Sequence, residues 1–505
     1  MDGNSNNLAN LSIPAAVEGA IDAMGLNLAT IRLHQRHVAQ YLSSGTSCLF
    51  KISDSCRINN GGIMPFPKVS GVKFEDVPIV AFVPAAGASS RYLMPMTDLV
   101  ESLRQLDHQM VMRRVTELLA SGVASCPLPD SFQELIRLVK SGVSVIPKEL
   151  AARVLVQIDA PKALYPAVTD GLTFLDVKRI EHEAIGVLSG EIYVCPPNKR
   201  DDFLHQANSK QRKLTMKCYE QGPSLATVRF DSSASVALDE AGQPSYVPAG
   251  HGALAHLLPK VKLDFPEARG VFIRNIDNIA GTSDEVLSSS RQFLNVFRES
   301  LLCVDAIRQA LSRQDSSDAS KYSRQLLILW GIEADANEDP LSKVLSRLFH
   351  TDLSKINDAQ AIFARPFVLM GQVPNTKRDV GGTCVFADVG GKVQKLCLEL
   401  PHASSEDRKI FLEDPAKATH FNPVFVAAEI LDNSILHAWA DHPFWLVAKK
   451  SWRGRDVYYQ ESILYELLGS SQHCNVIFVE IPRILFNPHK TLFDAVNKTS
   501  DFWLS

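Results

Sequence analysis

Apolar and polar positions change their spacing along the chain, and each change predicts a different kind of element. Apolar residues recur at helical spacing near the start and predict a helix at about 26–43. Residues 79–83 form a continuous apolar, β-branched run, which is typical of a strand buried on both faces of a parallel sheet. Short strand-like runs such as 192–194 and 271–273 then alternate with helical segments. This alternation predicts a layered α/β fold.

Farther along, the pattern changes twice more. Residues 284–360 are rich in helix signals and contain a polar stretch, 314–320, that predicts a flexible connector. Strand-like segments return after residue 360, and 476–479 predicts a late strand. We expect four successive parts: an N-terminal helical segment 1–75, a core 76–283, a helical insertion 284–360 and a C-terminal part 361–505 that completes the core.

Composition narrows the class of protein. In a chain of 505 residues, Lys plus Arg is 52 and Asp plus Glu is 56, a net charge of −4 that argues against a broad nucleic-acid-binding surface. The contents of 46% hydrophobic and 21% charged residues exclude intrinsic disorder. The first residues lack the pattern of a signal peptide, and no apolar run approaches the ~18 residues of a membrane span. The nine cysteines form no C-x-x-C pair. We expect a soluble, cytoplasmic protein with reduced thiols and no membrane partner.

Small residues follow the buried strand in the segment P-A-A-G-A-S-S-R at 84–91. They let the backbone approach a bulky anion, and successive N–H groups can then hold phosphate oxygens. Arg91 ends the segment, where a bidentate cation suits a di- or triphosphate. The alternative is a tight turn with a surface arginine. The candidate nucleotide-binding residues are Ala85, Ala86, Gly87, Ala88, Ser89 and Ser90.

Lys162 stands in the segment P-K-A-L-Y-P at 161–166, between two prolines. Proline stiffens the backbone around it, and a positioned ammonium can neutralise a phosphate oxygen in a transition state. The alternative is an ordinary solvated lysine. Arg91 and Lys162 are the two candidate catalytic residues.

Gly250 and Gly252 flank His251 in the segment P-A-G-H-G at 248–252. Glycines on both sides of a histidine suggest a backbone pressed against a ligand, with the imidazole as a hydrogen-bond donor. The alternative is a turn whose histidine is satisfied within the protein.

The segment R-N-I-D-N at 274–278 follows an apolar strand. In open α/β sheets, ligands bind at the carboxyl ends of the strands. Asp277 is a candidate Mg²⁺ ligand, because Mg²⁺ prefers hard oxygen ligands together with substrate phosphates. Asn275 and Asn278 can hydrogen-bond hydroxyls or order the loop. Capping of an Asx turn is the alternative.

Taken in order, these motifs look like those of the nucleotidyltransferases that activate sugar phosphates. The first two resemble motifs of bacterial sugar-1-phosphate and alditol-phosphate nucleotidylyltransferases. G-H-G and N-I-D-N resemble those of eukaryotic-type UTP–glucose-1-phosphate uridylyltransferases and UDP-N-acetylhexosamine pyrophosphorylases. Over residues 25–495 the chain is most similar to an uncharacterised family of bacterial proteins of about this length with a nucleotidyltransferase-like core. Further matches to it are T-H-F-N-P at 419–423, V-E-I-P at 479–482 and F-N-P at 486–488.

The resemblance implies a glycosyltransferase-A-like, Rossmann-related α/β fold with a mixed central sheet, helical insertions and a C-terminal α+β extension. It also implies a reaction in which a phosphate monoester oxygen attacks the α-phosphorus of a nucleoside triphosphate and pyrophosphate leaves. The implied partners are that triphosphate and a small phosphorylated acceptor, a sugar phosphate or a similar phosphate or phosphonate. The implied cofactor is Mg²⁺.

The same resemblance implies roles for single residues. The loop Ala85–Ser90 would hold the nucleotide phosphates, Arg91 would stabilise the leaving pyrophosphate, and Lys162 would steady the attacking phosphate or the α-phosphate. The segment Gly250–Gly252 would face the base or ribose, and Asp277 would bind Mg²⁺. Asn275 and Asn278 would lie on the substrate side, and the contacts implied on the acceptor side are His420, Asn422 and Lys449, or Lys450 in place of Lys449.

Two other hypotheses stay open. One is a glycosyltransferase that uses a nucleotide-sugar donor, although the segment at 275–277 only half fits the usual D-x-D-like metal motif. The other is a nucleotide-binding protein that has lost turnover. The chain also departs from the simpler bacterial enzymes, because a long helical stretch separates Arg91 from Lys162. The sequence leaves the nucleotide base, the acceptor and the oligomeric state unassigned.

Overall fold

The computed structural model divides the chain into two compact units. The first is formed by Met1–Pro78, Gln221–Phe272 and Gln292–Pro482, and the second by Ile79–Glu220, Ile273–Arg291 and Arg483–Ser505. Each unit is therefore assembled from three separate stretches of chain. The residues that the structure describes are 11–45, 50–68, 77–87, 92–208, 212–333, 335, 337–351, 359–376, 382–389, 391–400, 403–430 and 446–495.

The first unit contains a mixed sheet, a smaller antiparallel sheet and two strand pairs. Its strands are β1 (Phe50–Ser55), β5 (Ala226–Val228), β6 (Tyr246–Pro248), β7 (Gly270–Ile273), β8 (Phe367–Pro374), β9 (Thr383–Val389), β10 (Lys392–Leu398), β11 (His420–Glu429), β12 (Leu446–Trp452), β13 (Arg455–Glu461) and β14 (Asn475–Glu480). The mixed sheet has the order β14-β8-β11-β7, with β8 parallel to β14 and antiparallel to β11. The smaller sheet has the order β1-β9-β10, and β5–β6 and β12–β13 are antiparallel pairs.

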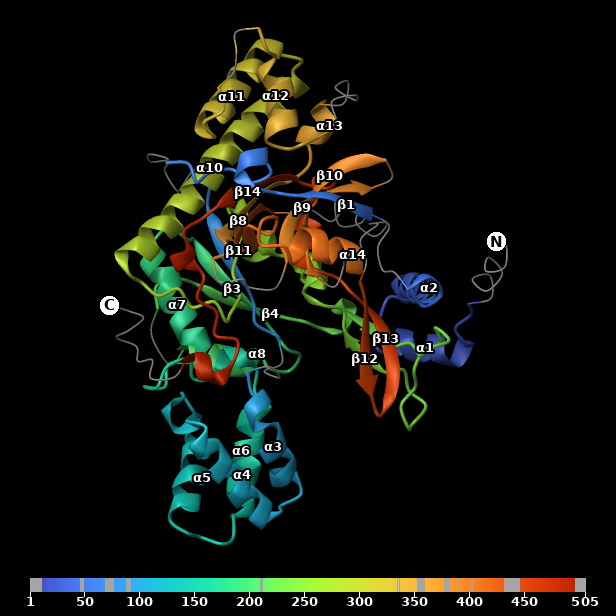
Figure 1. Ribbon diagram of the computed structural model, residues 1–505, viewed down its shortest axis with the longest axis vertical. Coiled ribbons are helices and arrows are strands. Elements are labelled where there is room, and N and C mark those ends of the chain that lie inside the picture. The colour runs from blue at the N-terminus through green and yellow to red at the C-terminus, as the bar shows by residue number, and fades with distance from the viewer. Residues whose placement is uncertain are drawn as a thin grey trace. The chain divides into compact units, whose positions relative to one another are not determined.

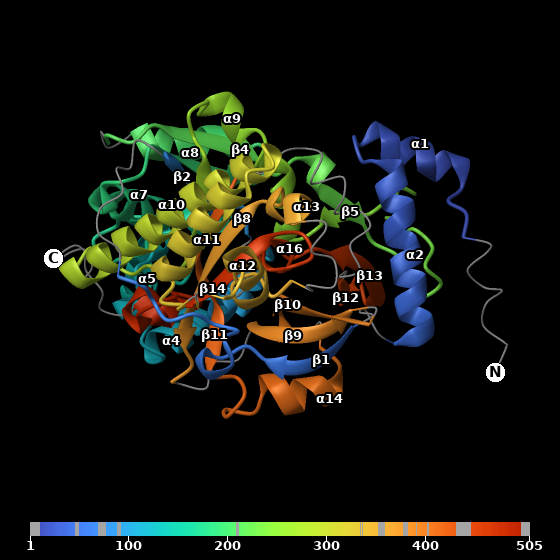
Figure 2. The same cartoon turned by 90° about the horizontal axis from the view of Figure 1, so that it is seen from above.

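Helices cover these strands. They are α1 (Ala15–Ala23), α2 (Leu28–Ser44), α9 (Val261–Asp264), α10 (Asp284–Ser312), α11 (Ser316–Leu329), α12 (Pro340–Arg347), α13 (Ala359–Phe363), α14 (Ser405–Asp407) and α16 (Leu464–Leu468). The Asn27 side chain accepts from the Thr30 N–H and caps α2, which ends at Gly45 with a φ of 71°. Ile31 and Val38 on its apolar face are buried with Tyr458 of β13. Figures 1 and 2 show α2 alongside the β12–β13 hairpin.

The second unit contains a parallel sheet with the order β2-β3-β4, formed by β2 (Ile79–Pro84), β3 (Gly190–Cys195) and β4 (Met216–Glu220). All six residues of β3 are buried, as are the first five of β2, because both faces are covered. Helices α3–α6 gather into one group in Figure 1. The helices of the unit are α3 (Thr97–Arg104), α4 (His108–Ala120), α5 (Asp130–Lys140), α6 (Lys148–Ile158), α7 (Phe174–Ile185) and α8 (Arg200–Asn208).

The structure confirms the predicted α/β class and most of the predicted elements. The helix expected at 26–43 is α2, and the strands expected at 79–83 and 476–479 are β2 and β14. The flexible connector expected at 314–320 is wrong, because the Asp315 side chain accepts from the Asp318 N–H and caps α11. The four successive parts do not coincide with the two interleaved units, and their boundaries stay a prediction.

Two expectations about the whole chain can also be compared with the structure. The eight cysteines of the described residues are free thiols. Across the described ranges, every helix is too short or too polar to cross a membrane.

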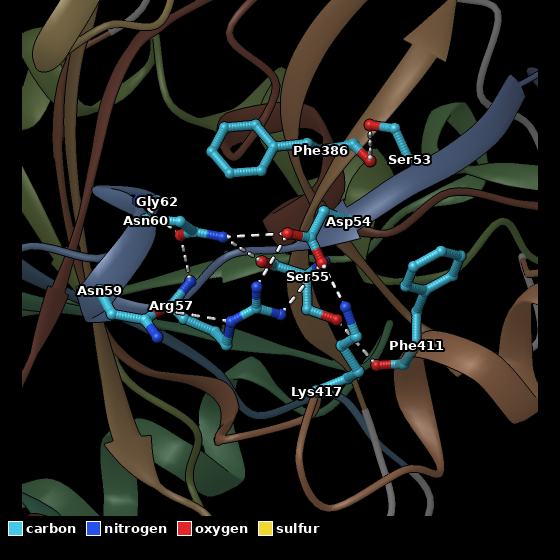
Figure 3. A network of polar contacts seen from close by, with 10 residues as sticks. All are labelled: Ser53, Asp54, Ser55, Arg57, Asn59, Asn60, Gly62, Phe386, Phe411 and Lys417. Atoms are coloured by element: carbon cyan, nitrogen blue, oxygen red, sulfur yellow. Dashed lines mark hydrogen bonds and ion pairs between the residues drawn. The ribbon is translucent and has the colours of Figure 1, made fainter.

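A network of polar contacts closes the end of β1 in the first unit (Figure 3). The Asp54 carboxylate accepts from both terminal nitrogens of Arg57, at 3.0 and 2.8 Å, and from Lys417 Nζ at 3.2 Å. The Ser55 N–H and the Asn60 amide donate to the same carboxylate, at 2.9 and 3.3 Å. Burial opposes ionisation of Asp54, but Arg57 and Lys417 outweigh it and lower its pKa to about 2.

Candidate active site

The small-residue segment begins where β2 ends, in the second unit. The Ala85 N–H donates to the Val194 carbonyl at 2.9 Å and extends the parallel pairing of β2 with β3. Ala86 is half-buried, and Gly87 is exposed. A Cβ placed on Gly87 would meet no heavy atom within 4 Å, so the space beside this backbone is open. Four predicted residues lie outside the described ranges, and their roles stay predictions: Ala88, Ser89, Ser90 and Arg91.

Lys162 is buried, so the alternative of a solvated lysine is wrong. It opens the 3₁₀ turn Lys162–Leu164, directly after Pro161. Its ammonium lies 4.8 Å from the centroid of the Tyr92 ring and 5.1 Å from that of Phe174, within cation–π range. It also donates to the backbone carbonyl of His489. Two aromatic rings and one carbonyl therefore hold this charge in place.

Asp277 faces this ammonium. Lys162 Nζ and Asp277 Oδ2 are 3.5 Å apart, and the two side chains are 11% and 28% exposed. Asp277 lies on the loop that follows β7, and the His489 N–H donates to its backbone carbonyl at 2.8 Å. Asn275 is exposed on the same loop. The structure thus brings together two residues that are 115 positions apart and to which the resemblance gave roles in one reaction.

Asn278 orders this loop. Its side chain is buried, its amide donates to the Leu485 carbonyl at 2.9 Å, and its amide oxygen accepts from the Asn487 N–H at 2.8 Å. The Asn487 amide donates in turn to the Ile279 carbonyl at 2.8 Å. Of the two roles expected for Asn278, these contacts correspond to ordering the loop.

A buried charge network supports the same loop from α7. Lys178 Nζ pairs with Glu181 at 2.8 Å and donates to the Asn278 carbonyl. Glu181 also accepts from the Gly281 N–H at 2.7 Å and lies 3.1 Å from the Arg274 guanidinium. Burial, reinforced by Arg274, lowers the pKa of Lys178 to about 8. Burial alone would raise the pKa of Glu181, but Lys178 and Arg274 outweigh it and hold that pKa below its usual range.

No role was predicted from the sequence for Lys178, Glu181 or Arg274. Helix α7 forms because Thr173 and Asp176 make a reciprocal capping box and Gly186 ends it at a φ of 72°. Lys178 and Glu181 stand on its buried side, one turn apart, among apolar residues. Charged residues at apolar positions of a helix are unusual, but this pattern does not tell which loop the helix supports.

Gly250, His251 and Gly252 lie in the first unit. A Cβ on Gly252 would lie 2.4 Å from the Ser462 carbonyl carbon, and one on Gly250, whose φ is 81°, would lie 2.5 Å from the Ser462 oxygen. The backbone is therefore pressed against another stretch of the protein. His251 is exposed, and its Nδ1 accepts from the Leu464 N–H at 3.3 Å. Packing against Ser462 thus explains why glycine is needed at both positions. That this segment faces a base or ribose stays a prediction.

The residues expected on the acceptor side also belong to the first unit. His420 is buried, with Nε2 at 2.9 Å from Glu480 Oε2 and Nδ1 at 2.9 Å from the Thr419 hydroxyl. Asn422 lies in β11, and its side chain is outside what the structure describes. Lys449 lies on β12 and pairs with Asp456 at 2.7 Å, with both side chains about half exposed. Their contact with an acceptor stays a prediction.

The fold and these clusters define a mixed α/β protein whose second unit pairs a buried lysine with a partly exposed aspartate. The sequence model of a family described as "Domain of unknown function (DUF4301)" matches residues 199–500, well over half of the chain. The chain therefore belongs to the DUF4301 family, which agrees with the predicted membership of an uncharacterised family. No match was found among curated proteins.

Solved structures similar to the chain include two described as enzymes of UDP-glucose. One is the UDP-glucose phosphorylase of Trypanosoma brucei, at 14% identity and a TM-score of 0.48, over 95% of this chain and 77% of that one. The other is the UDP-glucose pyrophosphorylase of Leishmania major, at 13% identity and a TM-score of 0.48, over 96% of this chain and 79% of that one. Likeness at this level does not transfer an activity, which has to come from the chain's own residues.

Proposed function

We propose that this protein is a nucleotidyltransferase. It would join a nucleoside monophosphate, taken from a nucleoside triphosphate, to a phosphorylated sugar or a similar small phosphate or phosphonate. An oxygen of the acceptor phosphate forms a bond to the α-phosphorus, the bond from the α-phosphorus to the bridging oxygen breaks, and pyrophosphate leaves. Each of the partners is an anion, so the protein mainly has to position them and neutralise charge.

The observation that supports this proposal is the pair formed by Lys162 and Asp277. Lys162 presents a positive charge that its surroundings hold in place, as a site for phosphate oxygens requires. The open backbone at Gly87, in the same unit, suits the close approach of a polyphosphate. We assign Lys162 to the attacking phosphate or the α-phosphate, and Ala85–Gly87 to the nucleotide phosphates.

The donor set fits a divalent cation of the Mg²⁺ type. Asp277 offers carboxylate oxygens and is partly exposed. Within the described residues, no three His, Cys, Asp or Glu side chains are grouped to hold a metal ion. A site with one carboxylate, completed by substrate phosphates and water, is how Mg²⁺ is commonly held. When bound, the ion would supply positive charge to the phosphate oxygens, and Asp277 is the residue that would hold it.

Release of pyrophosphate tests the proposal directly. ATP, CTP, GTP and UTP would each be combined with Mg²⁺ and a panel of sugar 1-phosphates and related phosphonates. We expect release with one triphosphate and one class of acceptor. Lys162→Met should then lower kcat/KM by a factor of about 100 or more, the loss seen when one transition-state donor is removed. Asp202→Asn, which removes an exposed pair with Lys199 in the same unit, is the control and should leave the rate unchanged.

The possible results separate the hypotheses. Release of pyrophosphate with none of these combinations would overturn the proposal. Binding of a nucleotide without release would instead indicate a binding protein that has lost turnover. A rate for Lys162→Met equal to that of the unmodified protein would overturn the site while leaving the activity.

A further inference from the structure

The two partners of the Lys162–Asp277 pair differ in how firmly they are held. The Lys162 ammonium lies against the Tyr92 and Phe174 rings and donates to the His489 carbonyl. These contacts do not involve Asp277, so they keep the charge in place when that carboxylate moves.

The Asp277 carboxylate is held more loosely. Its distance of 3.5 Å from Lys162 Nζ is at the outer limit of a hydrogen bond, and its side chain is the more exposed of the two. Among the described residues, Lys162 is the one side chain that hydrogen-bonds this carboxylate. The backbone of Asp277 is fixed by the His489 N–H at 2.8 Å, so rotation of the side chain is the movement left to it.

We propose that this pair is a latch that couples the binding of a polyphosphate to the binding of a divalent cation. Without a cation, Asp277 neutralises Lys162, and an incoming polyphosphate meets a carboxylate in front of the ammonium. When the carboxylate turns to a cation, Lys162 becomes available to the phosphate. The inference rests on the proposed function, since it assumes that the anion bound here is a nucleotide's phosphate chain.

Linkage makes the coupling reciprocal. If a cation on Asp277 raises the affinity for polyphosphate, bound polyphosphate raises the affinity for the cation by the same factor. A latch also differs from simple repulsion by Asp277. Repulsion acts whether or not Lys162 is present, whereas the effect of a latch requires Lys162.

A double-mutant cycle in the absence of metal separates these two effects. Binding of inorganic tripolyphosphate would be measured by calorimetry in EDTA for the unmodified protein, Asp277→Asn, Lys162→Met and the double variant. We expect Asp277→Asn to bind at least tenfold more tightly than the unmodified protein. In the Lys162→Met background the same substitution should change the affinity less than threefold. Asp202→Asn is the control for loss of one carboxylate in the same unit and should bind as the unmodified protein does.

Several outcomes would overturn the latch. Binding by Asp277→Asn in EDTA that is no tighter than that of the unmodified protein would do so, and so would an equal gain in both backgrounds. The proposed function would survive either result if the unmodified protein still releases pyrophosphate with Mg²⁺. Absence of tripolyphosphate binding by every variant, with and without Mg²⁺, would overturn both. If Lys162→Met fails to fold, as judged by circular dichroism, Lys162→Gln takes its place in the cycle.

Discussion

Two aspartates, one in each unit, show opposite ways of using a carboxylate. Asp54 in the first unit accepts from five donors, four of which lie within six residues of it in the chain (Figure 3). Asp277 in the second unit has a single side-chain partner among the described residues, Lys162, at 3.5 Å. Asp54 is the last residue but one of β1, Asp277 lies on the loop after β7, and both side chains are partly exposed. Both residues therefore lie near the end of a strand, but they differ in how many hydrogen bonds their carboxylates already accept.

The difference indicates which carboxylate is available to a ligand. An ionised carboxylate offers about four acceptor positions. The donors around Asp54 occupy them, so this residue holds the turn after β1 together. Most acceptor positions of Asp277 are unused. The carboxylate that supports its loop is Glu181, which pairs with Lys178 and Arg274 and accepts from the Gly281 N–H. In the second unit, Glu181 thus stabilises the loop, and Asp277 has acceptor positions left for a ligand.

The largest effect is expected from removing the charge of Glu181. Glu181→Gln leaves Lys178 and Arg274 buried without their counter-charge, which costs about 3–5 kcal/mol. The loop that carries Asp277 should loosen, because the Gly281 N–H donates to Glu181. Urea unfolding would measure the loss, and amide hydrogen exchange at Gly281 would locate it. Glu183→Gln, on the same helix but about 20% exposed, is the control and should cost far less. Equal losses in the two variants would show that Glu181 is not the main support of this loop.

Some of this site could be predicted from the sequence, because strands and short motifs are local. The run at 79–83 predicted β2, and proline before Lys162 and the strand before Asp277 marked both as candidates. The support beneath them could not be predicted, because it depends on which helix packs against which loop. Lys178 and Glu181 look like ordinary charged helix residues until the packing buries them.

The glycines on either side of His251 show a second limit of prediction from the sequence. They were expected to lie against a ligand, and the structure shows Ser462 of the protein itself beside both of them. A sequence motif records that space is tight without recording what occupies it.

The next largest effect concerns a buried lysine of the first unit. Lys395 donates to the Leu348 carbonyl at 2.9 Å and has no carboxylate partner within the described ranges, whereas Lys178 has Glu181. Burial lowers the pKa of Lys395 to about 8, from 10.5. Between these two pH values the unfolded chain binds a proton that the folded chain does not, so stability rises with pH, by on the order of 3 kcal/mol.

Lys395→Met should abolish this increase of stability with pH. At pH 7 the variant should be more stable than the unmodified protein, because a buried charge is replaced by an apolar side chain. Urea midpoints at pH 7, 8, 9 and 10 measure both effects. Lys449→Met, an exposed lysine of the same unit, is the control. A slope with pH identical to that of the unmodified protein would contradict the assignment to Lys395.

Two glycines extend the comparison to the backbone. Gly252→Ala places a Cβ 2.4 Å from the Ser462 backbone, which cannot give way as a side-chain tip can, and should cost about 1–3 kcal/mol. Gly87→Ala meets open space and should leave the unfolding midpoint nearly unchanged. If Gly87 adjoins the phosphates, Gly87→Ala should weaken the binding of tripolyphosphate, measured by calorimetry, even though its stability is unchanged. If Gly252→Ala were as stable as the unmodified protein, the expected difference between a glycine packed against backbone and one beside open space would be wrong.

The smallest effect is expected at Asp54. Asp54→Asn removes the partner of Arg57 and Lys417, and because these pairs are partly exposed the loss should be about 1 kcal/mol. Since the folded-state pKa of Asp54 is lowered from 3.8 to about 2, its contribution is present above pH 4 and is lost as the pH falls through 2. The difference in melting temperature between the unmodified protein and Asp54→Asn should therefore be constant from pH 4 to 7 and shrink toward pH 2. Affinity for tripolyphosphate should not change. A weakened affinity would mean that a saturated carboxylate also serves the ligand, and the distinction between Asp54 and Asp277 would then fail.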